Sequence, residues 1–199
     1  DSSYYALFHT ALYTGMRRSE LLGLKWTDVD FIFSQVYVNR SLHHLKNGNY
    51  VFTEPKSAKS RRTIALSPSA IVALKEHKEK QVLERAMLGI PLKDDDLVFS
   101  TLEGKPLRPN TITRAWTMLA ARAGVKVIRL HDARHTHASI MLKQGIHPKI
   151  VQERLGHASI SMTLDTYSHV APGLQQAAAE SFDKLLNGRR ENVAVENHY

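Results

Sequence analysis

Strand signals occupy one part of this 199-residue chain, and that restriction limits the folds that the chain can adopt. Runs rich in β-branched and aromatic residues lie at 29–33, 36–38, 50–53 and 62–66. Elsewhere, apolar periodicity and helix start and stop signals favour helices. We therefore predict an α+β fold, a mostly helical single domain with a small antiparallel β-sheet near the N-terminal third.

Prolines and glycines mark the expected boundaries of these elements. Ser67 followed by Pro68 is a helix start, with serine as the N-cap and proline at the first helical position. Gly15 is expected to break the first helical region. The expected helices cover 4–13, 19–24, 68–88, 110–123, 132–144 and 148–155, with a short helix or turn at 159–167. A last helix would carry on one face Leu174, Ala178, Phe182, Leu185 and Leu186.

Between the strands, turn residues predict tight connections. Asn47-Gly48-Asn49 is expected to turn the chain between strands 36–38 and 50–53. Residues 56–60 would then form an exposed hairpin loop before strand 62–66. We detect no internal repeat, no low-complexity segment and no internal linker.

The composition favours a polyanionic partner. Lysine and arginine total 27 against 19 acidic residues, which gives a formal net charge of +8. Neutralising nucleic-acid phosphates releases condensed counterions, so a basic chain binds such a partner well. An ordinary basic protein is the alternative that composition alone leaves open.

Several classes of protein are excluded or disfavoured. The chain has no cysteine, which rules out disulfides, a cysteine nucleophile and thiolate zinc sites. No run of about 18 apolar residues is present, so the sequence predicts no membrane-spanning helix. The first residues lack the basic and apolar regions of a signal peptide. A cytoplasmic protein is therefore expected.

Chemistry-bearing side chains gather in the C-terminal third. His131, Arg134 and His135 have the spacing of one helix face, and His131 begins that helix. His157 follows a glycine, and Tyr167 comes ten residues later. The HxxxH spacing of the first two histidines also suits zinc. However, the glutamate of HExxH and a further ligand cluster are missing, so we predict no metal.

Two upstream segments supply further cations. Arg17 follows a glycine at a helix break, and Glu20 is placed either to orient it or to form an ordinary helix salt bridge. Lys56 is either a general acid on a hairpin or one cation of a solvated basic loop. That basic loop would also include Lys59, Arg61 and Arg62. Tyr167 is either a nucleophile activated by these charges or a core anchor.

Taken together, these motifs resemble the tyrosine recombinases, also called phage-type integrases. The resemblance runs from about residue 4 to Tyr167. Thr14-Gly15-Met16-Arg17 with Glu20 is similar to the family's first arginine box, and Pro55-Lys56-Ser57 to its β-hairpin lysine. His131-Asp132-Ala133-Arg134 is similar to its His-x-x-Arg box, with alanine in place of a larger apolar residue. The order is completed by Leu155-Gly156-His157, which is similar to the family's second histidine motif, and by Asp165-Thr166-Tyr167, which is similar to its nucleophile segment.

The resemblance implies an activity and a set of roles. Tyr167 would attack a DNA phosphate, with Arg17 and Arg134 stabilising the developing charge. Lys56 would protonate the leaving oxygen, His131 would assist proton transfer, and His157 would donate to a non-bridging oxygen. Lys59, Arg61 and Arg62 would contact the DNA backbone. No metal, ATP or other cofactor is implied.

The resemblance also implies partners and limits. Residues 1–187 would form the catalytic domain, and 188–199 a flexible tail, with the family's N-terminal DNA-clamping domain absent from this chain. Double-stranded DNA and a homotetramer on synapsed DNA are expected, with a monomer as the alternative for this chain alone. A type IB topoisomerase and a non-catalytic DNA-binding domain are the rival functions.

Overall fold

The structure, a computed structural model, describes residues 3–54, 61–168, 176, 178–184 and 186. It confirms the predicted fold class, helices combined with small antiparallel sheets. The helices are α1 (Tyr5–Thr14), α2 (Arg18–Leu22), the 3₁₀ turn η1 (Trp26–Asp28), α3 (Pro68–Met87), α4 (Pro109–Arg122), α5 (Leu130–Lys143), α6 (Pro148–Leu155) and α7 (Ser161–Ser168). The strands are β1 (Val29–Asp30), β2 (Gln35–Val38), β3 (Ser41–His44), β4 (Tyr50–Thr53) and β5 (Arg62–Ala65).

The strands form two sheets in the described residues, where the sequence predicted one. In the first sheet β2 lies between β1 and β5, with Val36 opposite Ile64. In the second sheet β3 pairs with β4, with Leu42 opposite Phe52. The prediction missed β3 because Ser-Leu-His-His has no β-branched residue. Since β4 and β5 pair with different strands, the expectation of a hairpin between them was wrong.

β1 is also shorter than the predicted strand 29–33. The carboxylate of Asp30 accepts hydrogen bonds from the backbone N–H groups of Ile32 and Phe33 at 2.9 Å. Such a bond turns the chain locally, and Ser34 follows with a φ of 53°. The chain therefore reverses at once into β2.

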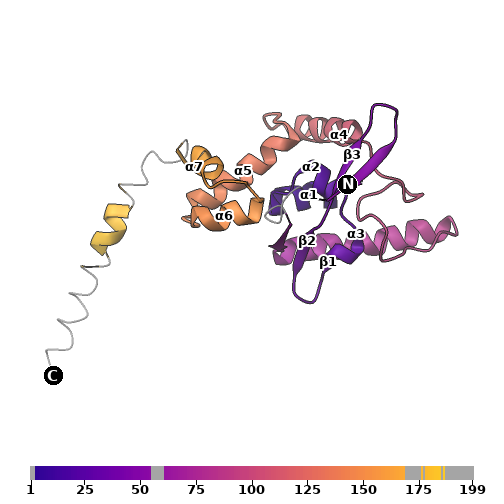
Figure 1. Ribbon diagram of the computed structural model, residues 1–199, viewed down its shortest axis with the longest axis horizontal. Helices are drawn as coiled ribbons and strands as arrows, with labels where there is room; N and C mark the ends of the chain where they lie inside the picture. The colour runs from indigo at the N-terminus through magenta and orange to yellow at the C-terminus, as the bar shows by residue number, and fades with distance from the viewer. Residues whose placement is uncertain (1–2, 55–60, 169–175, 177, 185, 187–199) are drawn as a thin grey trace, which may run out of the picture.

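Two apolar cores hold the molecule together. The larger joins α1, α2, α3, α4 and the three-stranded sheet, and it includes Leu7, Val36, Ile64 and Leu74, each at most 2% exposed. The smaller joins α5 and α6 through Ala138, Leu142, Val151 and Leu155. Figure 1 shows α5, α6 and α7 together at one side, next to α1 and α2. The side chains of Arg17 and Arg134 lie where these two parts meet.

At that junction α1 ends in a close approach to α5 and α6. Gly15 has a φ of 65°, and its N–H donates to the carbonyl of Ala11 at 3.0 Å. A Cβ atom at Gly15 would come within 2.5 Å of the Leu155 side chain and 2.9 Å of the His137 ring. Glycine is therefore required here both for conformation and for space.

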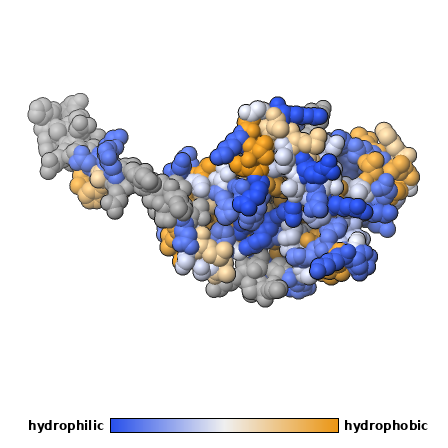
Figure 2. Space-filling model, turned by 90° about the horizontal axis from the view of Figure 1, so that it is seen from above, coloured by the Kyte–Doolittle hydropathy of each residue, from blue (hydrophilic) through white to orange (hydrophobic). Residues whose placement is uncertain are grey.

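The helical residues near the C-terminus, 178–184, stand apart from the compact part of the molecule (Figures 1 and 2). Phe182 on this helix is 66% exposed. Leu174 and Leu185, which were expected on the same helix face, lie outside the described residues. None of the helices in the described part of the chain is long and apolar enough to span a bilayer.

Candidate active site

Arg17 is fixed at the start of α2 by the residue three positions later. Its backbone N–H donates to Glu20 Oε2 at 2.8 Å, and its Nη1 donates to Glu20 Oε1 at 2.8 Å. Its Nη2 donates to the backbone carbonyl of Gly156 at 3.1 Å. The Arg17 side chain nevertheless remains 36% exposed. The predicted pairing of Arg17 with Glu20 is thus present, with Glu20 acting as both cap and anchor.

Glu20 is shared with a second arginine, Arg62 of β5. Arg62 donates from Nη1 to Oε1 at 3.0 Å and from Nη2 to Oε2 at 2.8 Å. Both side chains are 5% exposed. Burial alone would raise the pKa of Glu20, but the hydrogen bonds and charges of Arg62 and Arg17 outweigh it and hold that pKa below its ordinary value. Glu20 is therefore a carboxylate at neutral pH.

This placement corrects one expectation. The sequence put Arg62 in an exposed basic loop, where it would contact DNA, but its side chain is buried. Its Nε also donates to the carbonyl of Arg154 at 2.7 Å, so all three of its nitrogens are engaged within the protein. Arg62 was misread because Glu20, the partner that draws it inward, is 42 residues away in the sequence.

Arg134 reaches the junction from α5. It is 5% exposed, and it donates from Nη1 to the Gly15 carbonyl at 2.8 Å and from Nη2 to the Leu155 carbonyl at 2.6 Å. Burial, followed by the charge of Arg17, lowers the pKa of Arg134 to about 9. The guanidinium therefore stays protonated at neutral pH.

The carbonyls that hold Arg17 and Arg134 belong to helix ends. Gly15 ends α1, while Leu155 and Gly156 end α6. Carbonyl groups at a helix C-terminus lack partners in the helix and carry its partial negative charge, so they are suitable acceptors for guanidinium groups. Gly156 has a φ of 66°, and a Cβ there would come within 3.0 Å of Arg62. Gly156 thus allows Arg62 to approach the backbone closely.

His157 follows Gly156 and is 8% exposed. Its Nδ1 lies 2.9 Å from Oγ1 of Thr163, which is fully buried in α7. Burial, and then the charges of Arg134 and Arg17, lower the pKa of His157 to about 4. His157 is therefore a neutral imidazole at pH 7, and its hydrogen-bonding pattern depends on Thr163.

The histidines of α5 are placed differently. His131 and His135 are exposed, and their rings meet edge to face with centroids 5.1 Å apart. Partial desolvation of the His131 ring, and then the charge of the neighbouring His135, lower the pKa of His131 below its ordinary value, so it is a neutral proton acceptor at pH 7. Among the described residues, no group of three or more histidine, cysteine, aspartate or glutamate side chains could hold a metal.

Of the remaining predicted site residues, the structure describes only some. Lys56 and Lys59 lie outside the described residues. Arg61 is exposed and paired with Glu54. Tyr167 lies in the sequence of α7, four positions after Thr163. The structure thus brings together Arg17, Glu20, Arg62, Arg134, His157 and Thr163.

Sequence reasoning missed Arg154 of α6. This side chain donates from Nη1 to the Ala65 carbonyl at 3.0 Å, from Nη2 to the Tyr13 carbonyl at 2.9 Å and from Nε to His137 Nε2 at 3.1 Å. It therefore ties α6 to β5, α1 and α5. His137 Nδ1 lies 2.9 Å from the Leu12 carbonyl, so both ring nitrogens of this histidine have partners within the protein. The position of Arg154 directly before Leu155-Gly156-His157 was the available signal.

A family model described as the phage integrase family matches residues 1–173. The chain belongs to the phage integrase family. This membership confirms the resemblance carried by the arginine, histidine and tyrosine motifs. The match includes every residue of the arginine and histidine cluster described above and continues past Tyr167.

Individual relatives agree with the family assignment. The chain is 36% identical over 192 residues to a tyrosine recombinase XerC-like protein of Caldanaerobacter subterraneus subsp. tengcongensis, covering 91% of this chain and 49% of that protein. It is 33% identical over 187 residues to the ICEBs1 integrase of Bacillus subtilis, covering 94% of this chain and 50% of the integrase. The chain therefore spans about half the length of these relatives.

Solved structures show the same fold. The Tn1549 transposon integrase, in complex with a circular intermediate DNA, superposes with a TM-score of 0.75 at 25% identity, covering 90% of this chain and 58% of that chain. The XerA recombinase superposes with a TM-score of 0.68 at 25% identity, covering 91% and 58%. The family's fold is thus shared over nearly the whole chain.

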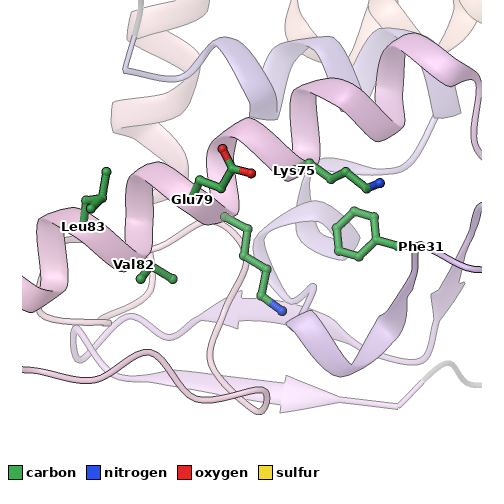
Figure 3. A pocket seen from close by; sticks show the side chains of 6 residues that line it. Phe31, Lys75, Glu79, Val82 and Leu83 are labelled. Carbon is green, nitrogen blue, oxygen red and sulfur yellow. The ribbon is translucent and has the colours of Figure 1, made fainter.

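A groove elsewhere on the surface has a different character. It measures about 610 Å³ and is lined by Phe31, Lys75, Lys78, Glu79, Val82 and Leu83 (Figure 3). The ammonium of Lys75 lies 5.8 Å from the centre of the Phe31 ring. None of the arginine and histidine side chains of the junction lines this groove, so we assign the chemistry to the junction.

Proposed function

We propose that this chain carries the catalytic domain, residues 1–187, of a site-specific DNA recombinase that cuts and rejoins strands through a 3′-phosphotyrosyl intermediate. One observation carries the proposal. Arg17 and Arg134 each use two of the five guanidinium N–H donors on protein oxygens through Nη1 and Nη2. Each therefore retains three N–H donors without a partner among the described residues, in a fixed orientation, for a phosphate.

In the proposed first step, the phenol oxygen of Tyr167 attacks the scissile phosphorus and the bond to the 5′ oxygen breaks. The phenol proton passes to neutral His131, and the 5′ oxygen takes a proton from Lys56 and leaves as a hydroxyl. Arg17 and Arg134 stabilise the extra charge on the non-bridging oxygens. Because the phosphotyrosyl bond retains the energy of the broken diester, a 5′-hydroxyl of another strand can reverse the step.

His157 acts in this scheme as a neutral donor. Its depressed pKa leaves one ring proton at pH 7. If the Thr163 hydroxyl donates to Nδ1, that ring proton resides on Nε2. Nε2 then donates to a non-bridging phosphate oxygen. Thr163 is accordingly a positioning residue, since it selects the tautomer that the reaction uses.

DNA is the proposed substrate. The net charge of +8 and the exposed Arg61 favour phosphate contacts, and the Tn1549 integrase is described in complex with DNA. We also propose a homotetramer on synapsed duplexes, with the action in the cytoplasm. The exposed Phe182 on helical residues 178–184 is suited to packing against a neighbouring subunit.

The test is covalent capture by the full-length protein. A library of nicked duplexes, from which the released strand diffuses away, is incubated with the protein, and adducts that persist in denaturant are sequenced. We expect a phosphotyrosyl bond at Tyr167 and no adduct with Tyr167→Phe. Adducts from the phenylalanine variant would remove Tyr167 from the mechanism, and the absence of any adduct would favour a non-catalytic DNA-binding domain.

A second assay separates the remaining rival. A type IB topoisomerase relaxes supercoiled DNA without bringing two sites together, whereas a recombinase exchanges strands between two captured sites. We expect the captured sequence to recombine with a second copy of itself. Relaxation without such exchange would favour the topoisomerase.

A further inference from the structure

A hollow lined by several cationic side chains adjoins the arginine cluster, and two of its lining residues, Arg17 and His131, also belong to the proposed reaction. It has a volume of about 410 Å³, within the range of small-ligand pockets. Three helices supply its lining: Arg17, Arg18 and Ser19 from the start of α2, Thr113 from α4, and Arg129, Leu130 and His131 from the start of α5.

The charge of this hollow is one-sided. Three guanidiniums line it, from Arg17, Arg18 and Arg129, and no carboxylate does. Arg17 is balanced by Glu20 and Arg129 by Asp132, whose Oδ1 lies 3.0 Å from Arg129 Nη2. Arg18 has no ion pair in the described part of the chain. The lining therefore carries an excess of positive charge, which favours an anion.

Its side chains are held in place yet keep donors available. Arg18 Nη1 donates to Thr113 Oγ1 at 2.7 Å, and Thr113 Oγ1 donates to the Pro109 carbonyl at 3.0 Å. Arg129 uses Nε and Nη2 on Asp132, which leaves both N–H groups of its Nη1 without a partner among the described residues. Two oriented guanidiniums can thus donate to the same ligand.

Arg17 belongs both to this hollow and to the proposed reaction centre. A ligand in the hollow is therefore adjacent to the phosphate that Arg17 and Arg134 would hold. In a DNA strand, the group adjacent to one phosphate is the next nucleotide, with its sugar and its own phosphate. The Arg18 and Arg129 donors suit that phosphate.

We propose that this hollow binds the phosphodiester next to the scissile one on the cleaved strand, with Arg18 and Arg129 as its ligands. This subsite rests on the proposed function and deepens it. It positions the strand without taking part in bond breaking. Loss of Arg18 or Arg129 therefore weakens DNA binding, while the bound complex can still form the phosphotyrosyl bond.

The test measures binding and chemistry separately on the same variants of the full-length protein. Affinity for a random-sequence 20-base-pair duplex is measured by fluorescence anisotropy over a series of salt concentrations. We expect Arg18→Gln and Arg129→Gln each to weaken binding at low salt by about tenfold, the scale of one charge-assisted hydrogen bond. The double variant should flatten the log–log salt slope by about 0.9, which corresponds to one phosphate.

We expect the Arg129→Gln variant to fold, because the bond that caps α5 at this position uses the backbone and not the arginine side chain. The backbone N–H of Arg129 caps α5 by donating to Asp132 at 3.0 Å, and glutamine keeps that bond. The matched control is Arg122→Gln, an exposed arginine near the other end of α4, nine residues from Thr113 and so about 14 Å along the helix. We expect little change in the affinity or salt slope of this control.

The outcomes separate this proposal from the recombinase proposal. With the captured DNA at saturation, Arg18→Gln and Arg129→Gln should still form the phosphotyrosyl adduct. An unchanged salt slope, or a slope change equal to that of Arg122→Gln, would overturn the subsite while adduct formation still supports the recombinase. A normal slope effect without any adduct in the wild type would instead reject the recombinase, and with it the subsite's assignment to a scissile strand.

Discussion

The Nδ1 atom of His157 lies 2.9 Å from the hydroxyl oxygen of Thr163, and both residues are buried. This contact links α7, the helix that contains Tyr167, to the end of α6, where Leu155 and Gly156 hold the two arginines. The proposed nucleophile and the phosphate-binding groups are therefore connected through one side-chain hydrogen bond. Its loss should affect the reaction more than the fold.

Thr163→Val tests this connection, because valine has nearly the same shape but no hydroxyl. Without a donor at Nδ1, the proton of His157 is free to occupy either nitrogen. We expect adduct formation to slow by about 10- to 100-fold, approaching the loss of one oxyanion donor, while DNA affinity is retained. Thr163→Ser should restore most of the rate. Equal rates for the valine variant and the wild type would exclude a role in selecting the tautomer.

The depressed pKa of His157 predicts a pH-dependent stability. The unfolded chain binds a proton at this residue below about pH 6.5, whereas the folded chain binds it only below about pH 4. Unfolding is therefore favoured as the pH falls through this window, and stability from this residue is complete above it. We expect a loss of about 3 kcal/mol between pH 7 and pH 4 from His157 alone.

Urea unfolding at several pH values checks this effect. In His157→Asn, the free energy of unfolding should fall less steeply from pH 6.5 to pH 4 than in the wild type. Parallel curves for the two proteins would show that His157 titrates equally in the folded and unfolded chains.

The forked geometry of Arg134 should matter more than its charge. A lysine at this position cannot bond the Gly15 and Leu155 carbonyls and also present a planar set of donors. We expect Arg134→Lys to lower the rate of adduct formation by about 100-fold or more. Arg17→Lys should behave similarly, and Arg18→Lys much less so, since Arg18 lies outside the set of bonds around Glu20. Similar mild effects at all three positions would contradict the assignment.

Local signals explain which parts of the fold were predictable. The Ser67-Pro68 start of α3 and the glycine at the end of α6 act within a few residues, and the structure has both as expected. β3 was missed because its pairing with β4, rather than its own composition, makes it a strand. Burial and pairing depend on residues distant in the sequence, which a single sequence does not reveal.

The same distinction applies to the candidate site. Residue type and spacing selected Arg17, Arg134 and His157 because short motifs carry them, and the fold brings these three residues together. They were not sufficient for Arg62 or Arg154, whose partners lie far away; Arg154 bonds Tyr13 across 141 residues. Arg62 was expected in an exposed loop and Arg154 was not singled out, whereas the fold places both against backbone carbonyl acceptors.

Lys56 lies outside the described residues, so its proposed role as the acid needs a chemical test. A substrate with sulfur in place of the 5′-bridging oxygen has a leaving group that departs without a proton. We expect this substrate to restore adduct formation by Lys56→Ala but not by Arg134→Ala, whose proposed role is charge stabilisation. Failure to restore the lysine variant would assign Lys56 to binding, or the acid role to another cation such as Lys59.

Arg62 and the adjacent Arg61 offer a matched pair for testing the buried ion pair. Arg62→Met leaves the buried carboxylate of Glu20 with Arg17 as its remaining ion-pair partner among the residues described here, and we expect a loss of about 3 kcal/mol in the free energy of unfolding. Arg61→Met removes an exposed pair with Glu54 and should cost under about 1 kcal/mol. Urea unfolding at pH 7 measures both.

Because Arg62 has all three nitrogens engaged, its loss should also disturb the orientation of Arg17 and slow adduct formation, whereas Arg61→Met should alter DNA affinity alone. Equal stability losses at the two positions would show that Arg62 is not the structural partner of Glu20.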